Sequence, residues 1–329
     1  MSGHHDGAPA RPSPASPAPS SSAPSPSSQP SRIQSWLELA RASNVATCLS
    51  NTLVGAAIGW RAAATTNEWS VTTAVRLAVT ALAIGLLYVA GMILNDVVDA
   101  TLDARERPAR PIPSGRISRR NAMIAFAACV AAALAVLTIL APVAAGVGLL
   151  LVAVIVAYDL LHQRSGGVIL LMGLSRALVY AVAAAAFGWP LDARLLVVFG
   201  ATIFVYIVAL STVARIEAQP SSAGARGAGQ RLAPMVLSVA PLAPLLVVRP
   251  SSWPWTILAA IVLFAWIQHG TMHLLATPSR RREAVMSWIA AISLVDALFL
   301  CMLDHPLLAL LAGSCIVATT VAHRRIAGT

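Results

Sequence analysis

Long apolar segments follow one another along most of the chain, and they restrict what it can fold into. A membrane-spanning helix needs about 20 mainly apolar residues, and lipid offers no hydrogen bonds to an exposed backbone. With 57% hydrophobic and 11% charged residues, the chain is too apolar for a water-soluble domain of this length. Segments of roughly spanning length occur at 44–60, 73–94, 122–140, 143–158, 168–187, 195–214, 232–248, 253–275, 285–302 and 307–322. We therefore predict an all-α, polytopic membrane protein, a helical bundle of about 9 to 10 transmembrane helices.

The first residues differ in composition from the rest. They are rich in Pro, Ser and Ala and contain no apolar core, which is typical of a disordered segment and not of a signal peptide. We predict three parts: a disordered cytoplasmic tail at 1–32, a transmembrane domain at 33–323, and a short C-terminal tail at 324–329.

The distribution of arginine predicts the orientation, since the sequence has no lysine. Basic residues concentrate in cytoplasmic loops of membrane proteins. If the N-terminus is cytoplasmic, the loop arginines that fall on the opposite side are only Arg61, Arg76, Arg194 and Arg249. We expect a cell-membrane protein whose N-terminus and chemically interesting loops share the cytoplasmic face. No basic soluble domain is visible, so we expect no nucleic-acid partner, and the oligomeric state stays open.

The sequence GMILNDVVDATLDARERPARPIPSGR places four polar or acidic side chains at the end of an apolar run. On a helix, Asp99 and Asp103 lie about 40° and 80° from Asn95. Asp96 lies about 100° away, so all four would point into one small volume. Such groups repel one another unless a cation sits among them, and Mg²⁺ prefers oxygen ligands and substrate phosphate. The motif therefore predicts a magnesium-diphosphate site.

The following loop is rich in proline and carries Arg107, Arg110 and Arg116. Proline restricts the backbone, which reduces the entropy lost when guanidinium groups are held around a polyanion. The loop therefore favours a diphosphate site. The alternative is a solvated cytoplasmic loop in which the acids merely balance the arginines.

The pattern NDxxDxxxD followed by an Arg-Pro-rich loop resembles the first signature of the UbiA superfamily of intramembrane prenyltransferases. The similarity extends over roughly 41–302, with Arg41 and Asn44 as an Arg-x-x-Asn pair and YDLLHQR (158–164) similar to the fourth loop of the family. By this resemblance, Asn95 and Asp99 would ligand Mg²⁺ on an isoprenyl diphosphate.

The resemblance also implies roles for other residues. Those expected in catalysis are Asp96, Asp103, Tyr158 and Arg215. Those expected to bind the substrate are Asn44, Arg107, Arg110, Arg116, Arg164, Arg176 and Glu217.

The second Asp-rich motif of the family is missing. Its place is taken by LSTVARIEAQ, with Ser211, Arg215 and Glu217 but no aspartate. Ser211 and Arg215 share a helix face, whereas Glu217 lies about 200° from Arg215. Either Arg215 neutralises the diphosphate in place of a second metal, or the second site and catalysis are lost. The segments GLSRALVY and STVARIE resemble the EboC-like branch of the family.

Arg176 falls inside an apolar segment. Arg176 should face the bundle interior or a polar cavity, where it either reaches the diphosphate or pairs with an acid. Asp296, like Asp304, is expected toward the outer side, near a helix end.

The leading hypothesis is an intramembrane prenyltransferase, in contact with membrane lipid, that transfers an isoprenyl group from a Mg-bound isoprenyl diphosphate. The acceptor would be lipophilic, and the sequence does not identify it. The alternative is a degenerate carrier or transporter that moves an amphipathic metabolite without prenyl transfer. The missing second motif favours the carrier, and the complete first motif favours the transferase.

Overall fold

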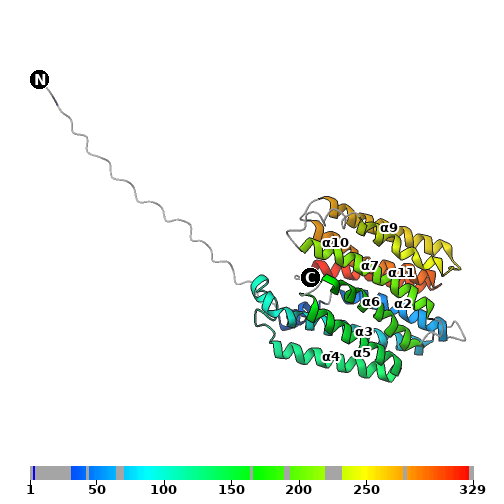
Figure 1. Ribbon diagram of the computed structural model, residues 1–329, viewed down its shortest axis with the longest axis horizontal. Helices are drawn as coiled ribbons and strands as arrows, with labels where there is room; N and C mark the ends of the chain where they lie inside the picture. Colours follow the sequence, from blue (N-terminus) through cyan, green and yellow to red (C-terminus); the bar gives the residue numbers. More distant parts are fainter. Residues whose placement is uncertain are drawn as a thin grey trace. The chain divides into compact units, whose positions relative to one another are not determined.

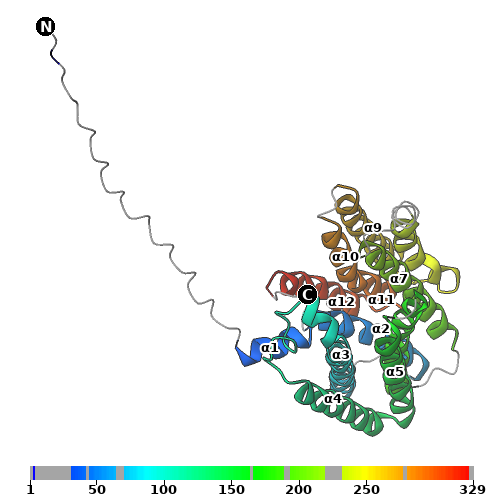
Figure 2. The ribbon, with the colours of Figure 1, turned by 60° about the vertical axis from the view of Figure 1, so that its left-hand side comes forward.

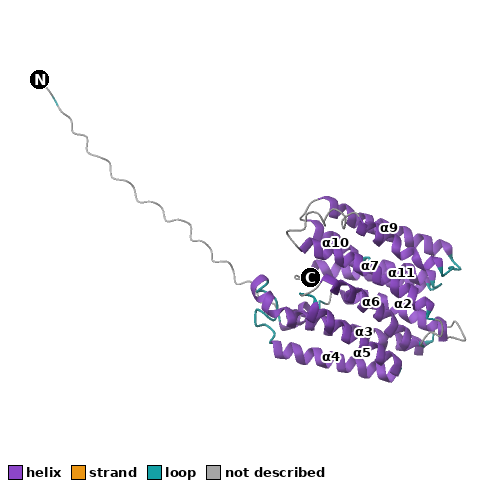
Figure 3. Ribbon diagram, viewed as in Figure 1, coloured by secondary structure: helices purple, strands orange, loops and turns teal. Residues whose placement is uncertain are grey.

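A computed structural model describes residues 3, 31–41, 44–63, 70–163, 166–188, 193–218, 232–276 and 280–325. Regular structure in these ranges is entirely helical (Figure 3). Most of the predicted tail at 1–32 lies outside the described residues, as do Arg164 and residues 326–329.

The long helices of the domain run side by side (Figure 1). The α-helices are α1 (Arg32–Leu39), α2 (Val45–Ala63), α3 (Val71–Glu106), α4 (Arg119–Leu140), α5 (Pro142–Leu161), α6 (Ile169–Phe187), α7 (Arg194–Ala218), α9 (Trp253–Ala276), α10 (Arg281–Ala290), α11 (Ile292–Met302) and α12 (Pro306–Arg325). Residues 232–239 are also helical and lead into the 3₁₀ segment η3 (Ala240–Leu246), and the 3₁₀ turn η2 (Gly166–Val168) precedes α6. All ten apolar runs of the sequence are therefore helical, and the run 285–302 is divided between α10 and α11.

Seven helical segments in the described residues are long and apolar enough to cross a membrane. The apolar window of α4 is only 11% buried, whereas that of Arg281–Met302 is 78% buried, so α10 and α11 form the interior and α4 an outer wall. Large apolar side chains such as Ile139 and Leu310 point outward, as a lipid-facing surface requires. The predicted all-α, multi-pass membrane bundle is confirmed. The shorter apolar helices, Leu232–Leu246 and Pro306–Ala322, and α2 account for the remaining predicted spans.

Helix α2 lies at the centre of the bundle, in contact with α3, α6, α11 and α12 (Figure 2). Its closest approach to α6 depends on two glycines. A Cβ at Gly55 would lie 2.5 Å from the carbonyl oxygen of Tyr180, and one at Gly59 would collide with the backbone of Ala184. Small residues allow such close packing between membrane helices. The described residues form two large apolar clusters, and each cluster contains residues of both α2 and α6.

The end of α3 projects the acidic motif beyond the apolar layer. This helix has 36 residues, about 54 Å at 1.5 Å per residue, whereas the hydrocarbon core of a bilayer is about 30 Å thick. A small apolar cluster fixes the projecting end, with Leu39 from α1, Ile93 and Val97 from α3, Ile117 from the next loop, and Ala122 from α4.

Arg116 ties the arginine loop to α1. Its Nη1 donates to Glu38 Oε2 at 2.9 Å and to Ser35 Oγ at 3.0 Å, and its Nη2 donates to the carbonyl oxygen of Ala109 at 2.6 Å. Gly115 turns the chain here with a φ of +75°, a conformation that favours glycine. Arg116, predicted to bind substrate, is thus engaged in holding the loop.

We predict that Gly59→Val destabilises the protein by about 1–3 kcal/mol, because the added side chain forces α2 away from the backbone of α6. The measurement is thermal unfolding of detergent-solubilised protein. The matched control is Gly85→Ala, on α3, where an added Cβ meets nothing within 4 Å. It should stabilise slightly, since alanine favours helix over glycine. Equal unfolding temperatures for the two variants would contradict the proposed packing.

Candidate active site

A cavity of about 280 Å³ lies between α2, α3, α5, α6 and α7. Polar residues at its mouth come from the end of α3, the end of α5 and the residues before α2, and include Arg41, Asn44, Asn95, Tyr158 and Asp159. Apolar side chains two or more turns further along the same helices line much of the remainder, among them Ile84 on α3 and Leu151 on α5. The cavity therefore joins a charged mouth to an apolar interior.

Arg110 holds two of the four motif side chains. Its Nη1 lies 2.6 Å from Asp103 Oδ2 and 3.3 Å from Asp96 Oδ1. The side chains are largely buried, with 4% of Asp103, 7% of Asp96 and 16% of Arg110 exposed, so solvent screens these ion pairs little. One guanidinium thus fixes α3 to its following loop.

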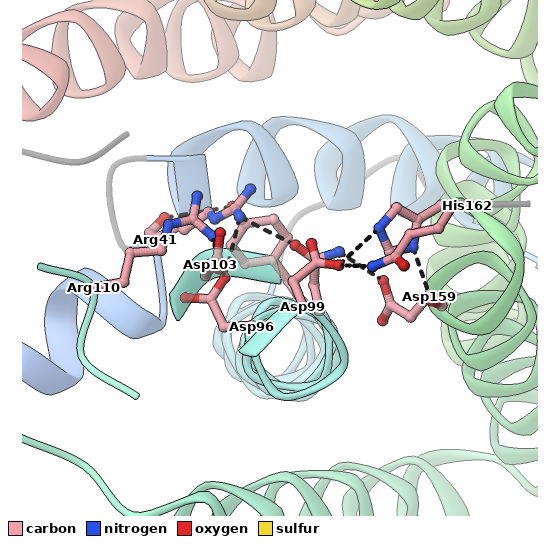
Figure 4. Close-up of polar contacts among 10 residues, drawn as sticks. Arg41, Asp96, Asp99, Asp103, Arg110, Asp159 and His162 are labelled. Atoms are coloured by element: carbon pink, nitrogen blue, oxygen red, sulfur yellow. Dashed lines mark hydrogen bonds and ion pairs between the residues drawn. The ribbon is translucent and has the colours of Figure 1, made fainter. Parts of the chain in front are cut away.

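The other two motif side chains face the end of α5 (Figure 4). Asp99 Oδ1 accepts from Gln163 Nε2 at 2.6 Å and lies 3.0 Å from His162 Nε2. Asn95 Nδ2 donates to Asp159 Oδ1 at 3.1 Å.

Arg41 links the two groups, because its Nη2 donates to Asn95 Oδ1 at 3.1 Å and to Asp96 Oδ1 at 3.2 Å. Asn95 and Asp96 thus share one nitrogen of Arg41, and Asp96 and Asp103 share one nitrogen of Arg110, so these motif side chains do meet. Their partners nevertheless divide them into two pairs. The four directions span about 100° around α3, which is wide enough for Arg110 to bind one pair and for α5 to face the other.

The oxygens of Asn95 and Asp99 could hold a metal ion. No group of three or more His, Cys, Asp or Glu side chains in the described part of the chain is arranged to bind one. Mg²⁺ does not require such a group, because it often takes one or two carboxylates and completes its shell with water and substrate phosphate. Asp96 and Asp103 are bound by Arg110, and their expected part in catalysis stays a prediction.

The structure places the other predicted site residues as follows. Tyr158 lines the cavity and stacks on His162 with ring centroids 5.7 Å apart, and Asn44 also lines the cavity. Arg215 Nη1 donates to the carbonyl oxygen of Gly166 at 3.3 Å. Arg107 is exposed at the end of α3. Glu217 belongs to α7, but its side chain, like all of Arg164, lies outside what the structure describes.

Arg176 also lines the cavity, from α6. Its guanidinium donates to Asn51 Oδ1 at 2.7 Å and to Thr47 Oγ1 at 3.2 Å, both on α2. The prediction that it faces the interior of the bundle is confirmed.

Behind Arg176 lies a buried acid that the sequence analysis misplaced. Asp296 was expected near a helix end but lies within α11, fully buried. Its carboxylate accepts from Asn51 Nδ2 at 2.8 Å and from the hydroxyls of Ser50 and Tyr180. An acid inside an apolar run was the available signal, since such residues face the bundle interior.

Two curated proteins illustrate the relatives of this chain. The digeranylgeranylglyceryl phosphate synthase of Haloquadratum walsbyi is 30% identical over 218 residues, which cover 64% of this chain and 69% of the relative. That of Korarchaeum cryptofilum is 37% identical over 92 residues, 28% of this chain and only 29% of the relative's length.

Solved structures share the fold. A UbiA homolog from Aeropyrum pernix K1 has a TM-score of 0.59 at 17% identity, covering 77% of this chain and 96% of that one. A UbiA homolog from Archaeoglobus fulgidus, solved with DMAPP and Mg2+, has a TM-score of 0.56 at 12% identity, covering 82% of this chain and 99% of that one.

The narrower similarity to the EboC-like branch stays a prediction. The family match is broader, because it runs from α2 to α10 and so includes the acidic motif, the arginine loop and most of the cavity. Over residues 48–289 the chain matches the UbiA prenyltransferase family, and it therefore belongs to that family.

Proposed function

We propose that this protein transfers an isoprenyl group from an isoprenyl diphosphate to a lipophilic acceptor within the membrane. One observation carries the proposal: Asn95 and the guanidinium of Arg41 lie at the mouth of a largely apolar cavity, and Asp99 follows Asn95 one helical turn further along α3. A prenyl diphosphate has the matching chemistry, a polyanionic head on an apolar tail. The carrier hypothesis is less favoured, because the curated relatives are synthases.

Magnesium fits the residues at this mouth. Asn95 and Asp99 offer hard oxygen donors. Asp99 Oδ1 is contacted here by nitrogen atoms of His162 and Gln163, and a cation would replace these contacts. When bound, Mg²⁺ supplies charge neutralisation for the diphosphate leaving group.

The residues of the chain position the substrate and exclude water. Arg41 contributes positive charge at the head group, and Tyr158 offers a phenolic hydroxyl at the same mouth. Apolar walls such as Ile84 and Leu151 hold the first part of the tail away from water. The bond between the allylic carbon and the diphosphate oxygen breaks, the acceptor's nucleophilic atom bonds to that carbon, and the acceptor releases a proton.

The similarity to digeranylgeranylglyceryl phosphate synthases supports an acceptor that carries both an apolar part and an anionic group. The guanidinium of Arg176, on the cavity wall, offers a positive charge to the anionic group of such an acceptor.

Asp99→Asn should abolish Mg²⁺-dependent turnover and lower metal affinity by more than the roughly 10- to 100-fold caused by losing an orienting partner of a ligand. The measurement is diphosphate release from dimethylallyl, geranyl and geranylgeranyl diphosphates, with and without a lipid extract. The matched control is Asp304→Asn, an acid paired with Arg61 away from this site. Unchanged metal dependence in the Asp99 variant would refute the assignment.

In place of a second metal, Arg215 contributes a guanidinium to the diphosphate. Arg215→Ala should then weaken diphosphate binding by about 1.5–3 kcal/mol, the range for a hydrogen bond to a charged group. Binding is measured by calorimetry with an unreactive thiolodiphosphate analogue. Arg105→Ala removes an exposed arginine at the end of α3 and should bind normally. Equal affinities for the two variants would argue against this role.

We further propose that the active-site mouth and the N-terminus face the cytoplasm, as the positive-inside rule indicates. In a cysteine-free background, an impermeant maleimide on intact cells should label Ser251→Cys, on the opposite side. It should label Arg120→Cys, at the start of α4, only after the cells are permeabilised. The reverse pattern would invert the orientation.

A further inference from the structure

Asp159, a charged residue near the end of α5, carries an unusual carboxylate. Its residue is only 2% exposed, and Oδ1 accepts a hydrogen bond from Asn95 Nδ2 at 3.1 Å. The second oxygen, Oδ2, is buried and has no hydrogen-bond partner within the described residues. A buried carboxylate oxygen without a donor is destabilising, so the site is arranged for a positively charged or donating group that is not part of the described chain.

The position of Asp159 favours a cation as the missing partner of Oδ2. It lines the cavity next to Asn95, and His162 connects it to Asp99: the imidazole Nε2 lies 3.0 Å from Asp99 Oδ1 and Nδ1 lies 2.8 Å from the backbone oxygen of Asp159. Figure 4 shows Asp99 and Asp159 on facing helices, with His162 beside both. Two acids and one amide thus meet at the mouth.

A carboxylate for a cation at this mouth could also come from α7. Ser211 is buried with its hydroxyl 2.9 Å from Met172 Sδ, and the next residue on that face is Arg215. The described side chains of α7 therefore provide no carboxylate for a cation at the mouth.

We propose that Asp159 is a direct ligand of the divalent cation, so that α5 supplies the second carboxylate that α7 lacks. This inference rests on the proposed function and deepens it. The resulting set, Asp99, Asp159 and the amide oxygen of Asn95, gives a hard cation two carboxylates and leaves its other positions for water and diphosphate, as Mg²⁺ requires. Arg215 then faces diphosphate and not metal.

Metal binding can be measured without turnover. Mn²⁺ bound to the intact protein is followed by electron paramagnetic resonance, with and without geranyl S-thiolodiphosphate. Asp159→Asn should weaken Mn²⁺ binding at least about tenfold, and Asp159→Glu, which keeps the carboxylate, should lose less. Asp304→Asn should bind like the wild type. Thermal unfolding identifies any variant that fails to fold.

Affinity alone does not separate a ligand from a residue that only orients Asn95, since losing an orienting partner also reduces affinity about 10- to 100-fold. Asp159→Cys makes the distinction. A direct ligand changed from oxygen to thiolate should shift the preference of the site from Mn²⁺ to the softer Cd²⁺. Asp304→Cys, tested alongside, should show the preference of the wild type.

The two proposals fail in different ways. If the wild type shows no metal-dependent binding of the analogue, the proposed function is wrong. If the wild type binds the analogue with Mn²⁺ and Asp99→Asn does not, the function stands. In that case, an Asp159→Cys variant without any gain in Cd²⁺ preference overturns the assignment of Asp159.

Discussion

The compensation of buried carboxylates by two arginines is the constraint on which the active-site end depends. Asp96 and Asp103 lie almost out of water near the end of α3, where unpaired charges would be strongly destabilising. Arg110 reaches back from the loop and Arg41 reaches across from the segment before α2. These contacts fix the loop, the end of α3 and the start of α2 relative to one another, and the cavity mouth forms where they meet.

Buried charged groups are also compensated deeper in the bundle. Arg176 and Asp296 carry opposite charges, but Asn51 stands between them, accepting from the guanidinium and donating to the carboxylate. Because Asn51 lies on α2, Arg176 on α6 and Asp296 on α11, this chain of hydrogen bonds joins three central helices. The same hydrogen bonds hold the Arg176 guanidinium at the cavity wall. A hydrocarbon tail alone would not require a positive charge there.

The second acidic motif is missing from α7, and in our proposal α5 serves the head group in its place. In this chain the charged end of α5, with Asp159, His162 and Gln163, faces the motif on α3. Helix α7 presents Ser211 and Arg215 instead. A head-group site assembled from α3 and α5 would not require acidic ligands from α7. This is consistent with a catalytic function despite the missing aspartates.

The sequence by itself determined the membrane bundle, the family and the acidic motif, because apolar length and a spaced set of acids are local properties of the chain. Helical geometry correctly placed Asn95 and Asp99 on one side of the helix, but it could not show that Arg110 binds Asp96 and Asp103. Nor could it show that Arg116 binds α1, that Asp296 is central, or that Asp159 Oδ2 has no hydrogen-bond partner among the described residues. Those outcomes depend on side chains from distant segments competing for the same partners, and only the packing of the helices decides which of them meet.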